Sequence, residues 1–345
     1  MPTIKDALDI IKKLTVAERE MLKSLLVSPS LAGSMDMQGF VTKERFANGR
    51  VCPHCGCTHV VRNGTRKDGT QRYLCRDCGK SFVVTSNSIV AGTHKELDVW
   101  EKYISCMMSG LSLRKTATIC GIHRNTAFIW RHKILDALQN MANGVQLDGI
   151  VEADETFFDI SYKGNHSKSK TFTMPREARH RGHSSHVRGL SHDKVCVPCA
   201  VNRNGLSIAK VTNTGRVSTK DLHHIYDGRI KPTATLVTDK LNSYVRFTTA
   251  NGIELVQLKT GKTKRGIYNI QHINNYHSQL KKFMQRFNGV STKYLNNYLI
   301  WHNFVNYSKE TDVEKQLILL TFALTTIKAE NCNELPRRPE IPLAA

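Results

Sequence analysis

The chain has 345 residues, of which 40% are hydrophobic, and its formal net charge is +21. This length allows two or three domains with a sizeable core, and the basic excess predicts a polyanionic partner. Charge alone does not separate DNA-binding from RNA-binding or membrane-surface proteins. The longest apolar run, residues 317–324, is far shorter than the roughly 20 residues of a membrane span. Since the N-terminus also lacks the apolar region of a signal peptide, we expect a cytoplasmic protein.

The first 46 residues are expected to precede the functional domains. Residues 3–28 have the apolar spacing of helices and predict a small helical pair. Residues 29–46 are polar and contain glycine and serine, which is typical of a linker.

Two CxxC pairs come next and predict a metal site. The four cysteines are Cys52, Cys55, Cys75 and Cys78, with 19 residues between the pairs. Thiolates at this spacing can close a tetrahedron around Zn²⁺, and a reducing cytoplasm favours metal binding over disulfides. We predict a structural zinc ribbon with short strands at 60–62 and 71–74.

A helix-turn-helix is predicted after the ribbon. Residues 113–119 form the first helix with Ser112 as its N-cap, Gly121 lies in the turn, and residues 123–135 form the second helix. A plain helical hairpin with solvated charges is the alternative. The residues expected on the exposed face of the second helix are Arg124, Asn125, Arg131 and Lys133.

These four side chains are the predicted DNA-binding residues. A recognition helix reads bases from its N-terminal half, so Arg124 and Asn125 are the candidate base readers. Arg131, His132 and Lys133 are expected to meet phosphate. The buried face is expected to carry Ala127, Ile129 or Trp130, and Ile134.

From residue 149 onward the pattern changes to strands and helices. Five strands are predicted, at 149–158, 194–205, 206–215, from 233 to near Asp239, and at 253–261, with helices at 218–230 and after the last strand. Three strands joined by tight turns, followed by helix, strand and helix, indicate a mixed α/β sheet of the ribonuclease-H type. A third CxxC, Cys196 and Cys199, is not predicted to bind metal, because residues three apart on a strand point to opposite faces.

Two aspartates lie in or at the end of these strands. Asp154 interrupts an apolar strand and shares a face with Glu152, whereas Glu155 points the other way. Asp239 ends another apolar strand, where active sites of open α/β sheets gather. Carboxylates are the ligands that Mg²⁺ prefers, so a pair of Mg²⁺ or Mn²⁺ ions acting in phosphoryl transfer is expected. Alone, either aspartate could instead be structural.

The last predicted helix of the domain has a polar face without a carboxylate. On residues 272–282, the side chains of Asn274, His277, Ser278 and Lys281 share one face.

Between the first two strands, residues 161–194 are rich in Lys, Arg, His, Ser and Gly, which predicts a mobile basic loop that either folds over DNA or is merely solvated. A further apolar helix and a disordered, proline-containing tail are expected to end the chain.

We therefore expect a multidomain α/β protein with five segments. They are an N-terminal helical segment (1–46), a zinc ribbon (47–90), a helix-turn-helix domain (91–145), a ribonuclease-H-like catalytic domain (146–310), and a C-terminal helix and tail (311–345).

The sequence resembles a known family across about residues 50–305. The ribbon CPHC…CRDCGKSF, the segment GLSLRKTA, the strands VEADETFF and LVTD, and the helix HINNYHSQLKKFMQ are similar to those of bacterial insertion-sequence transposases of the group whose type element is numbered fifteen ninety-five. These enzymes belong to the DDE superfamily, with a retroviral-integrase-like catalytic domain. The resemblance implies a protein associated with the nucleoid.

The resemblance also implies roles for individual residues. Asp154 and Asp239 match the first two catalytic aspartates, and Asn274 with Lys281 fits an Asp-Asp-Asn-Lys pattern. Asn274 lies 35 residues after Asp239, similar to the spacing of the superfamily's third acid. His277 is the rival third ligand, because related sequences carry a glutamate near its position. We expect Asn274, and Lys281 would contact DNA phosphate.

The implied activity is DNA transposition. Such an enzyme would bind the terminal inverted repeats of its element, cleave at the element ends with two metal ions, and join the freed 3′-hydroxyl to target DNA, working as a homo-oligomer. The first alternative is an inactive or domesticated copy that acts as a DNA-binding regulator, which the missing third carboxylate would favour. The second is a ribonuclease-H-like nuclease without strand transfer.

Overall fold

A computed structural model describes residues 36–164, 172–175, 193–258, 264–308, 310–325 and 334–342. The chain forms two compact units, the first drawn from residues 1–137 and 312–330, and the second from 138–311 and 331–345. The predicted helical pair at 3–28 and most of the basic segment 161–194 lie outside the described residues. No helix of the described ranges has the length and apolar character to cross a bilayer.

The first unit begins with a helix where a linker was expected. Helix α3 (Met37–Arg45) buries Met37 and Val41, which are four residues apart and share one face. The guanidinium of Arg45 donates to the carbonyl of Ser86 at 2.9 Å and to that of Thr325 at 2.7 Å. The prediction of a linker over 29–46 is therefore wrong for these nine residues, because tertiary packing orders a segment of weak helical pattern.

The zinc ribbon has the predicted strands and one more. The three-stranded antiparallel sheet has the order β1 (Val60–Thr65), β2 (Gln71–Cys75) and β3 (Ser81–Phe82). Tyr73 stacks on Phe82 with ring centroids 5.7 Å apart, which supplies a small core.

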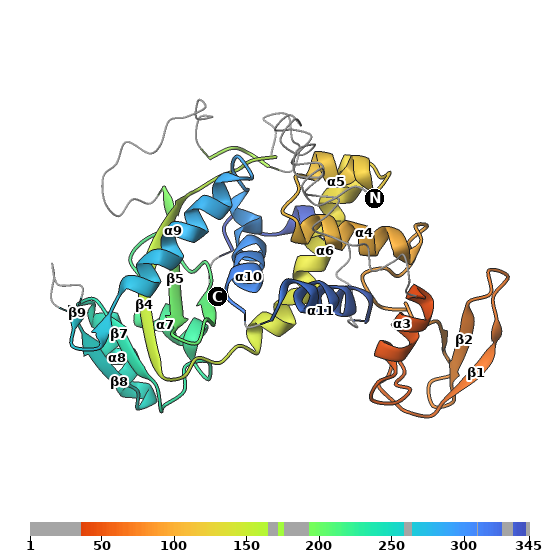
Figure 1. Ribbon diagram of the computed structural model, residues 1–345, viewed down its shortest axis with the longest axis horizontal. Coiled ribbons are helices and arrows are strands. Elements are labelled where there is room, and N and C mark those ends of the chain that lie inside the picture. Colours follow the sequence, from red (N-terminus) through yellow and green to blue (C-terminus); the bar gives the residue numbers. More distant parts are fainter. Residues whose placement is uncertain are drawn as a thin grey trace, which may run out of the picture. The chain divides into compact units, whose positions relative to one another are not determined.

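Four helices complete the first unit (Figure 1). They are α4 (Leu97–Met108), α5 (Leu113–Ile119), α6 (Arg124–Asn143), which continues into the second unit, and α11 (Asp312–Thr325). Helix α5 has the predicted bounds, and the hydroxyl of Ser112 caps it by accepting from the amide of Lys115. Gly121 adopts a φ of 58° in the turn before α6, a conformation that favours glycine. The helix-turn-helix layout is therefore present.

The second unit contains a five-stranded sheet with the order β6-β5-β4-β7-β8. The strands are β4 (Ile150–Asp159), β5 (Lys194–Asn202), β6 (Ser207–Ala209), β7 (Thr235–Thr238) and β8 (Glu254–Gln257). Strand β5 runs antiparallel to both of its neighbours, β4 and β6, whereas β4, β7 and β8 run parallel. This topology is the ribonuclease-H-like arrangement expected from the sequence, which is confirmed.

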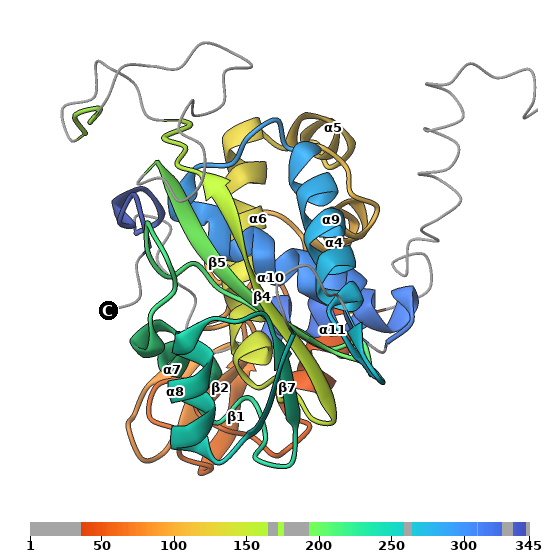
Figure 2. The same ribbon diagram turned by 90° about the vertical axis from the view of Figure 1, so that its left-hand side faces the viewer.

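Helices cover both faces of this sheet (Figure 2). One face packs against α7 (Thr219–Tyr226) and α8 (Asn242–Asn251), and the other against α9 (Gln271–Gln285) and α10 (Leu295–Asn306). Cys196 is buried in the first of these cores and Cys199 in the second. The expectation that these cysteines point to opposite faces is confirmed. Helix α8, between β7 and β8, was not predicted.

The C-terminal segment divides between the two units. Helix α11 packs on α3 and α4 in the first unit, whereas the described tail residues 334–342 belong to the second. Leu335 is 2% exposed, and its carbonyl accepts a hydrogen bond from the hydroxyl of Tyr294 at 3.1 Å. Glu340 pairs with Lys293 at 3.2 Å. The prediction of a disordered tail is therefore wrong for these residues, because Leu335 is buried.

Candidate active site and zinc centre

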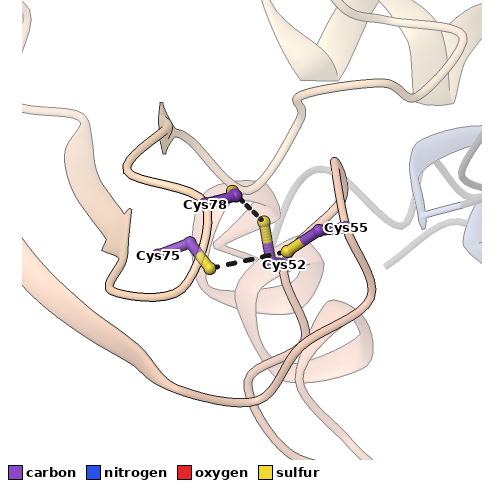
Figure 3. A group of neighbouring side chains, drawn as sticks. All are labelled: Cys52, Cys55, Cys75 and Cys78. Carbon is purple, nitrogen blue, oxygen red and sulfur yellow. Dashed lines mark hydrogen bonds between the residues drawn. The ribbon is translucent and has the colours of Figure 1, made fainter.

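The four cysteines of the ribbon converge on one point (Figure 3). Their sulfur atoms all lie within 4.8 Å of one another, and the closest pairs are Cys55 with Cys75 at 3.6 Å and Cys52 with Cys78 at 3.7 Å. A tetrahedral Zn²⁺ with Zn–S bonds of about 2.3 Å holds its sulfur atoms about 3.8 Å apart. The arrangement therefore fits a structural zinc ion with four thiolate ligands.

The strand order brings the two predicted aspartates together. Strands β4 and β7 are parallel neighbours, and Glu152 pairs with Val237 at the end of their ladder. Two residues further along each chain come Asp154 and Asp239. Because parallel strands keep their register, Asp154 in the middle of β4 and Asp239 just after the end of β7 lie at the same level of the sheet.

The two acids lie in partly desolvated surroundings. Burial, with the charge of Asp239 as a smaller cause, raises the pKa of Asp154 to about 6, whereas the charge of Lys281 opposes the shift. The pKa of Asp239 is also raised by desolvation, against the charge of Arg216. Two acids that resist ionisation side by side would gain from a bound cation.

A third acid lies beside them on the opposite face of β4. Burial raises the pKa of Glu155 to about 7, and its carboxylate accepts a 2.7 Å hydrogen bond from the hydroxyl of Tyr244 on α8. Glu152 faces the other way and contacts α9. The predicted division of faces between Glu152 and Glu155 is thus confirmed.

Helix α9 places His277 beside Asp154. Its Nδ1 lies 3.9 Å from Oδ2 of Asp154, and the side chain is 11% exposed. Burial lowers the pKa of His277 to about 4, so the imidazole is neutral at pH 7. Among the described residues, its buried Nε2 has no hydrogen-bond partner. A neutral imidazole with an unsatisfied nitrogen beside a carboxylate suits metal coordination.

Asn274 and Lys281 occupy more open positions on the same helix. Both side chains are exposed, one turn to either side of His277. Lys281 lies near enough to lower the pKa of Asp154. Within the described ranges, only the four ribbon cysteines bring three or more Cys, His, Asp or Glu ligand atoms within 4.8 Å of one another. The ligand atoms of Asp154, Asp239 and His277 are therefore more widely spaced than those of the zinc centre.

The exposed face of α6 carries some of the predicted DNA-binding residues. Arg124 and Asn125 are exposed at the start of α6, as expected for base readers. Lys133 is half-buried and donates to the carbonyl of Ile89 at 3.4 Å. Of the residues expected on the buried face, Ala127, Trp130 and Ile134 are buried.

Arg131 and His132 require a correction, because both were expected to meet phosphate and both are buried. Arg131 is 1% exposed and donates from Nη2 to the carbonyl of Leu111 at 3.0 Å. The expected exposed position is wrong, because Arg131 lies one turn after the buried Ala127 and three residues before the buried Ile134, on the inner face. Its guanidinium bridges to the turn before α5 instead of facing solvent.

The sequence reasoning missed the role of Glu152. Its side chain is 1% exposed and contacts the first turn of α9. A carboxylate within a buried strand, two residues from Asp154, was the available signal, but its partner is 120 residues away.

Two family profiles match the chain. The ISXO2-like transposase domain matches residues 146–304, and a transposase zinc-ribbon domain matches residues 38–81. Both fall on the parts that resembled insertion-sequence transposases.

Solved structures show weaker similarity. The simian T-cell lymphotropic virus intasome in complex with PP2A regulatory subunit B56 gamma is 12% identical, over 59% of this chain and 60% of that chain, with a TM-score of 0.23. A pre-cleavage Mos1 transpososome is 8% identical, over 70% of this chain and 82% of that chain, with a TM-score of 0.22. The chain thus spans less than two thirds of the intasome chain, and similarity this low carries no functional argument.

Proposed function

The chain belongs to the ISXO2-like family of zinc-ribbon transposases, and from this premise we propose that it is an active DNA transposase of an insertion sequence. It binds the terminal inverted repeats of its element, cleaves the strand at the element ends and joins the freed 3′-hydroxyl to target DNA. It works as a homo-oligomer on paired ends, on the nucleoid in the cytoplasm.

The observation that carries the proposal is the meeting of three elements around Asp154. Asp239 comes from the neighbouring parallel strand, and His277 comes from the covering helix. Asp154 and Asp239 would hold Mg²⁺ or Mn²⁺, ions that in phosphoryl transfer activate the attacking oxygen and stabilise the leaving oxygen. Burial, with the charge of Asp239 as a smaller cause, raises the pKa of Asp154 to about 6, and a bound cation would favour the ionised form of both carboxylates.

For the third ligand we favour His277 over Asn274. The imidazole lies 3.9 Å from Asp154 and is buried with an unsatisfied nitrogen, whereas the Asn274 side chain is exposed. Imidazole suits Mn²⁺ better than Mg²⁺, so this assignment makes Mn²⁺ the better-supported ion. Lys281 is available for DNA phosphate.

DNA recognition is assigned to the first unit. Arg124 and Asn125, exposed at the start of α6, read bases at the element ends. The net charge of +21 supports binding to the phosphate backbone. Arg131 is left out of this surface because it is buried.

The test uses DNA that carries the flanks of the gene, with Mg²⁺ or Mn²⁺ supplied. Wild type is expected to nick at the element ends and to form joined products. Asp154→Ala and Asp239→Ala should each lower nicking by about a thousandfold or more, since metal assistance is worth several kcal/mol. Undiminished nicking by both variants would refute the assignment of the active site.

A second candidate function is a DNA-binding regulator. The residue of α9 that lies 3.9 Å from Asp154 is a histidine and not an acid, which is the feature that favours a copy without catalysis. Tight binding to the element ends with no cutting under either metal would establish it. Nicking without joined products would instead indicate a nuclease.

A further inference from the structure

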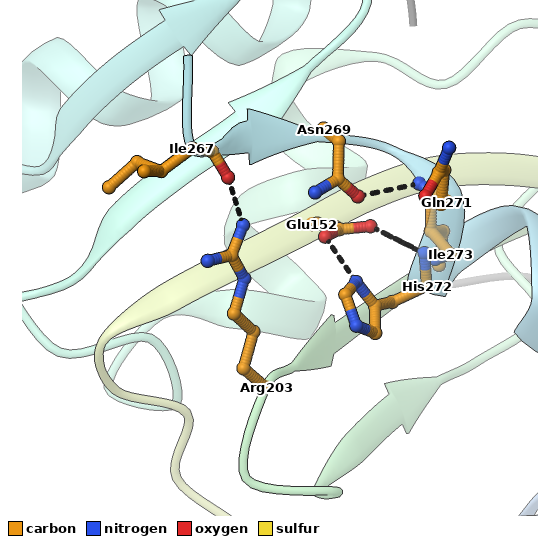
Figure 4. Close-up of polar contacts among 7 residues, drawn as sticks. All are labelled: Glu152, Arg203, Ile267, Asn269, Gln271, His272 and Ile273. Carbon is orange, nitrogen blue, oxygen red and sulfur yellow. Dashed lines mark hydrogen bonds and ion pairs between the residues drawn. The ribbon is translucent and has the colours of Figure 1, made fainter. Parts of the chain in front are cut away.

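The first turn of helix α9 is held by groups outside the helix (Figure 4). A helix leaves its first amides without intrahelical partners. Here Asn269 accepts from the amide of Gln271 at 3.0 Å, and Oε2 of Glu152 accepts from the amides of His272 at 2.8 Å and Ile273 at 3.2 Å. The other oxygen, Oε1, lies 2.7 Å from Nδ1 of His272.

These contacts use both oxygens of Glu152. The residue is 0% exposed in the middle of the sheet, where an uncompensated carboxylate would be costly. Three hydrogen bonds and the positive end of the helix dipole compensate for that burial. Glu152 therefore ties the start of α9 to strand β4, two residues before Asp154.

The loop that follows α9 is held by a charge of opposite sign. Just after β4, Nζ of Lys163 donates to the carbonyls of Phe287 at 3.1 Å, Asn288 at 2.9 Å and Gly289 at 2.8 Å. These carbonyls lie two to four residues beyond Gln285, the last residue of the helix, where a cation also interacts favourably with the helix dipole. Strand β4 and the residues after it therefore grip α9 by its first turn and by the loop that follows it.

We infer that Glu152 and Lys163 are positioning residues that fix His277 over Asp154. The inference rests on the proposed function, in which β4 and α9 each supply a metal ligand. Because both grips come from β4 and the residues that follow it, they set the height and the tilt of the helix relative to Asp154. Weakening either grip should therefore loosen metal binding without removing a ligand.

The test measures Mn²⁺ binding by electron paramagnetic resonance, on zinc-loaded full-length protein without DNA. Glu152→Ala is expected to weaken Mn²⁺ binding about tenfold, because the loss of a group that orients a metal ligand typically lowers metal affinity by about ten- to a hundredfold. Glu152→Gln keeps an acceptor for the two amides and should recover part of this loss. In the zinc-loaded protein without added Mn²⁺, backbone hydrogen exchange at the first turn of α9 should be faster in Glu152→Ala than in wild type.

Tyr294→Phe is the matched control. It removes a hydrogen bond in the same unit, from Tyr294 to the Leu335 carbonyl, and touches neither grip. It should lower the thermal midpoint while leaving Mn²⁺ affinity as in wild type. Glu152→Ala could instead bind Mn²⁺ within twofold of wild type while its thermal midpoint falls as far as that of Tyr294→Phe. That result would make Glu152 a purely structural residue and overturn the inference.

Lys163→Met provides a second variant if Glu152→Ala fails to fold. Lys163 is exposed, so its replacement should preserve the core, and Mn²⁺ binding is expected to weaken about two- to fivefold. Unchanged affinity in this variant would overturn the role of the C-terminal grip.

Failure of the proposed function would look different. A wild-type protein that neither binds Mn²⁺ nor cuts DNA, or Mn²⁺ binding that survives Asp154→Ala, would overturn the active site itself, and the inference with it. Normal binding and cutting by wild type and by Glu152→Ala would overturn only the positioning role.

Discussion

His277 and Asp154 approach each other to 3.9 Å, Nδ1 to Oδ2, although they lie on different elements and 123 residues apart in the sequence. The aspartate is on β4 and the histidine on α9, so the contact depends on how the helix packs across the sheet. It is also the relationship that separates the two candidates for the third ligand, since Asn274 lies on the same helix but is exposed.

Replacement of each candidate ligand should give unequal effects. His277→Ala is expected to weaken Mn²⁺ binding and to lower nicking by about ten- to a hundredfold, because it removes the buried nitrogen beside Asp154. Asn274→Ala should change both by less than about threefold. Mn²⁺ titrations monitored by nicking would compare the two, and a larger loss in Asn274→Ala would assign the third ligand to the asparagine.

The zinc centre offers a matched pair of cysteines. Cys55→Ser removes one of the four converging thiols and should lower the zinc content and unfold the ribbon, since so small a sheet depends on its metal. Cys57→Ser changes a nearby thiol outside the cluster and should leave about one zinc per chain. Elemental analysis and circular dichroism would measure both. Equal loss of zinc from the two variants would contradict the four-cysteine assignment.

Two arginines of α6 should behave differently when replaced by alanine. Arg124→Ala removes an exposed side chain, and should weaken binding to the element ends by about 1–3 kcal/mol with an unchanged thermal midpoint. Arg131→Ala removes a buried guanidinium that donates to Leu111, and should destabilise the first unit by about 1–3 kcal/mol. Fluorescence anisotropy and thermal unfolding would distinguish them. A purely DNA-binding effect of Arg131→Ala would contradict its burial.

A buried histidine predicts sensitivity to acid. Burial lowers the pKa of His302 to about 4 in the folded chain, against about 6.5 when unfolded. Because the folded chain favours the neutral imidazole, the contribution of His302 to stability is complete above about pH 6.5 and is lost as the pH falls towards 4. Over that window the free energy of unfolding should fall by an amount on the order of 3 kcal/mol from this residue.

His302→Phe provides the comparison. The histidine packs against Tyr276 and Phe283 with ring centroids 5.1 and 5.4 Å away, so an aromatic replacement suits the site. Thermal midpoints at pH 7 and pH 4.5 should differ less in this variant than in wild type. An identical pH dependence in both proteins would show that His302 does not contribute to acid sensitivity.

The sequence by itself determined the local features. Two CxxC pairs predicted the zinc site, Ser112 and Gly121 predicted the bounds of α5 and the turn after it, and strand periodicity predicted the faces of Glu152 and Glu155. These features depend on neighbours within a few residues, where cap chemistry and the two-residue period of a strand act directly. The mixed α/β fold class followed from the types of the elements and their order along the chain.

Only the tertiary structure decided which groups meet across the fold. Spacing along α9 gave Asn274 and His277 one face, but the packing of that helix on β4 brings the histidine next to Asp154. In the same way, Arg131 is buried and Glu152 grips a helix 120 residues away. The physical reason is that a helical period fixes which residues share a face, whereas the rotation and height of the helix are set by side-chain packing and by charges from distant strands.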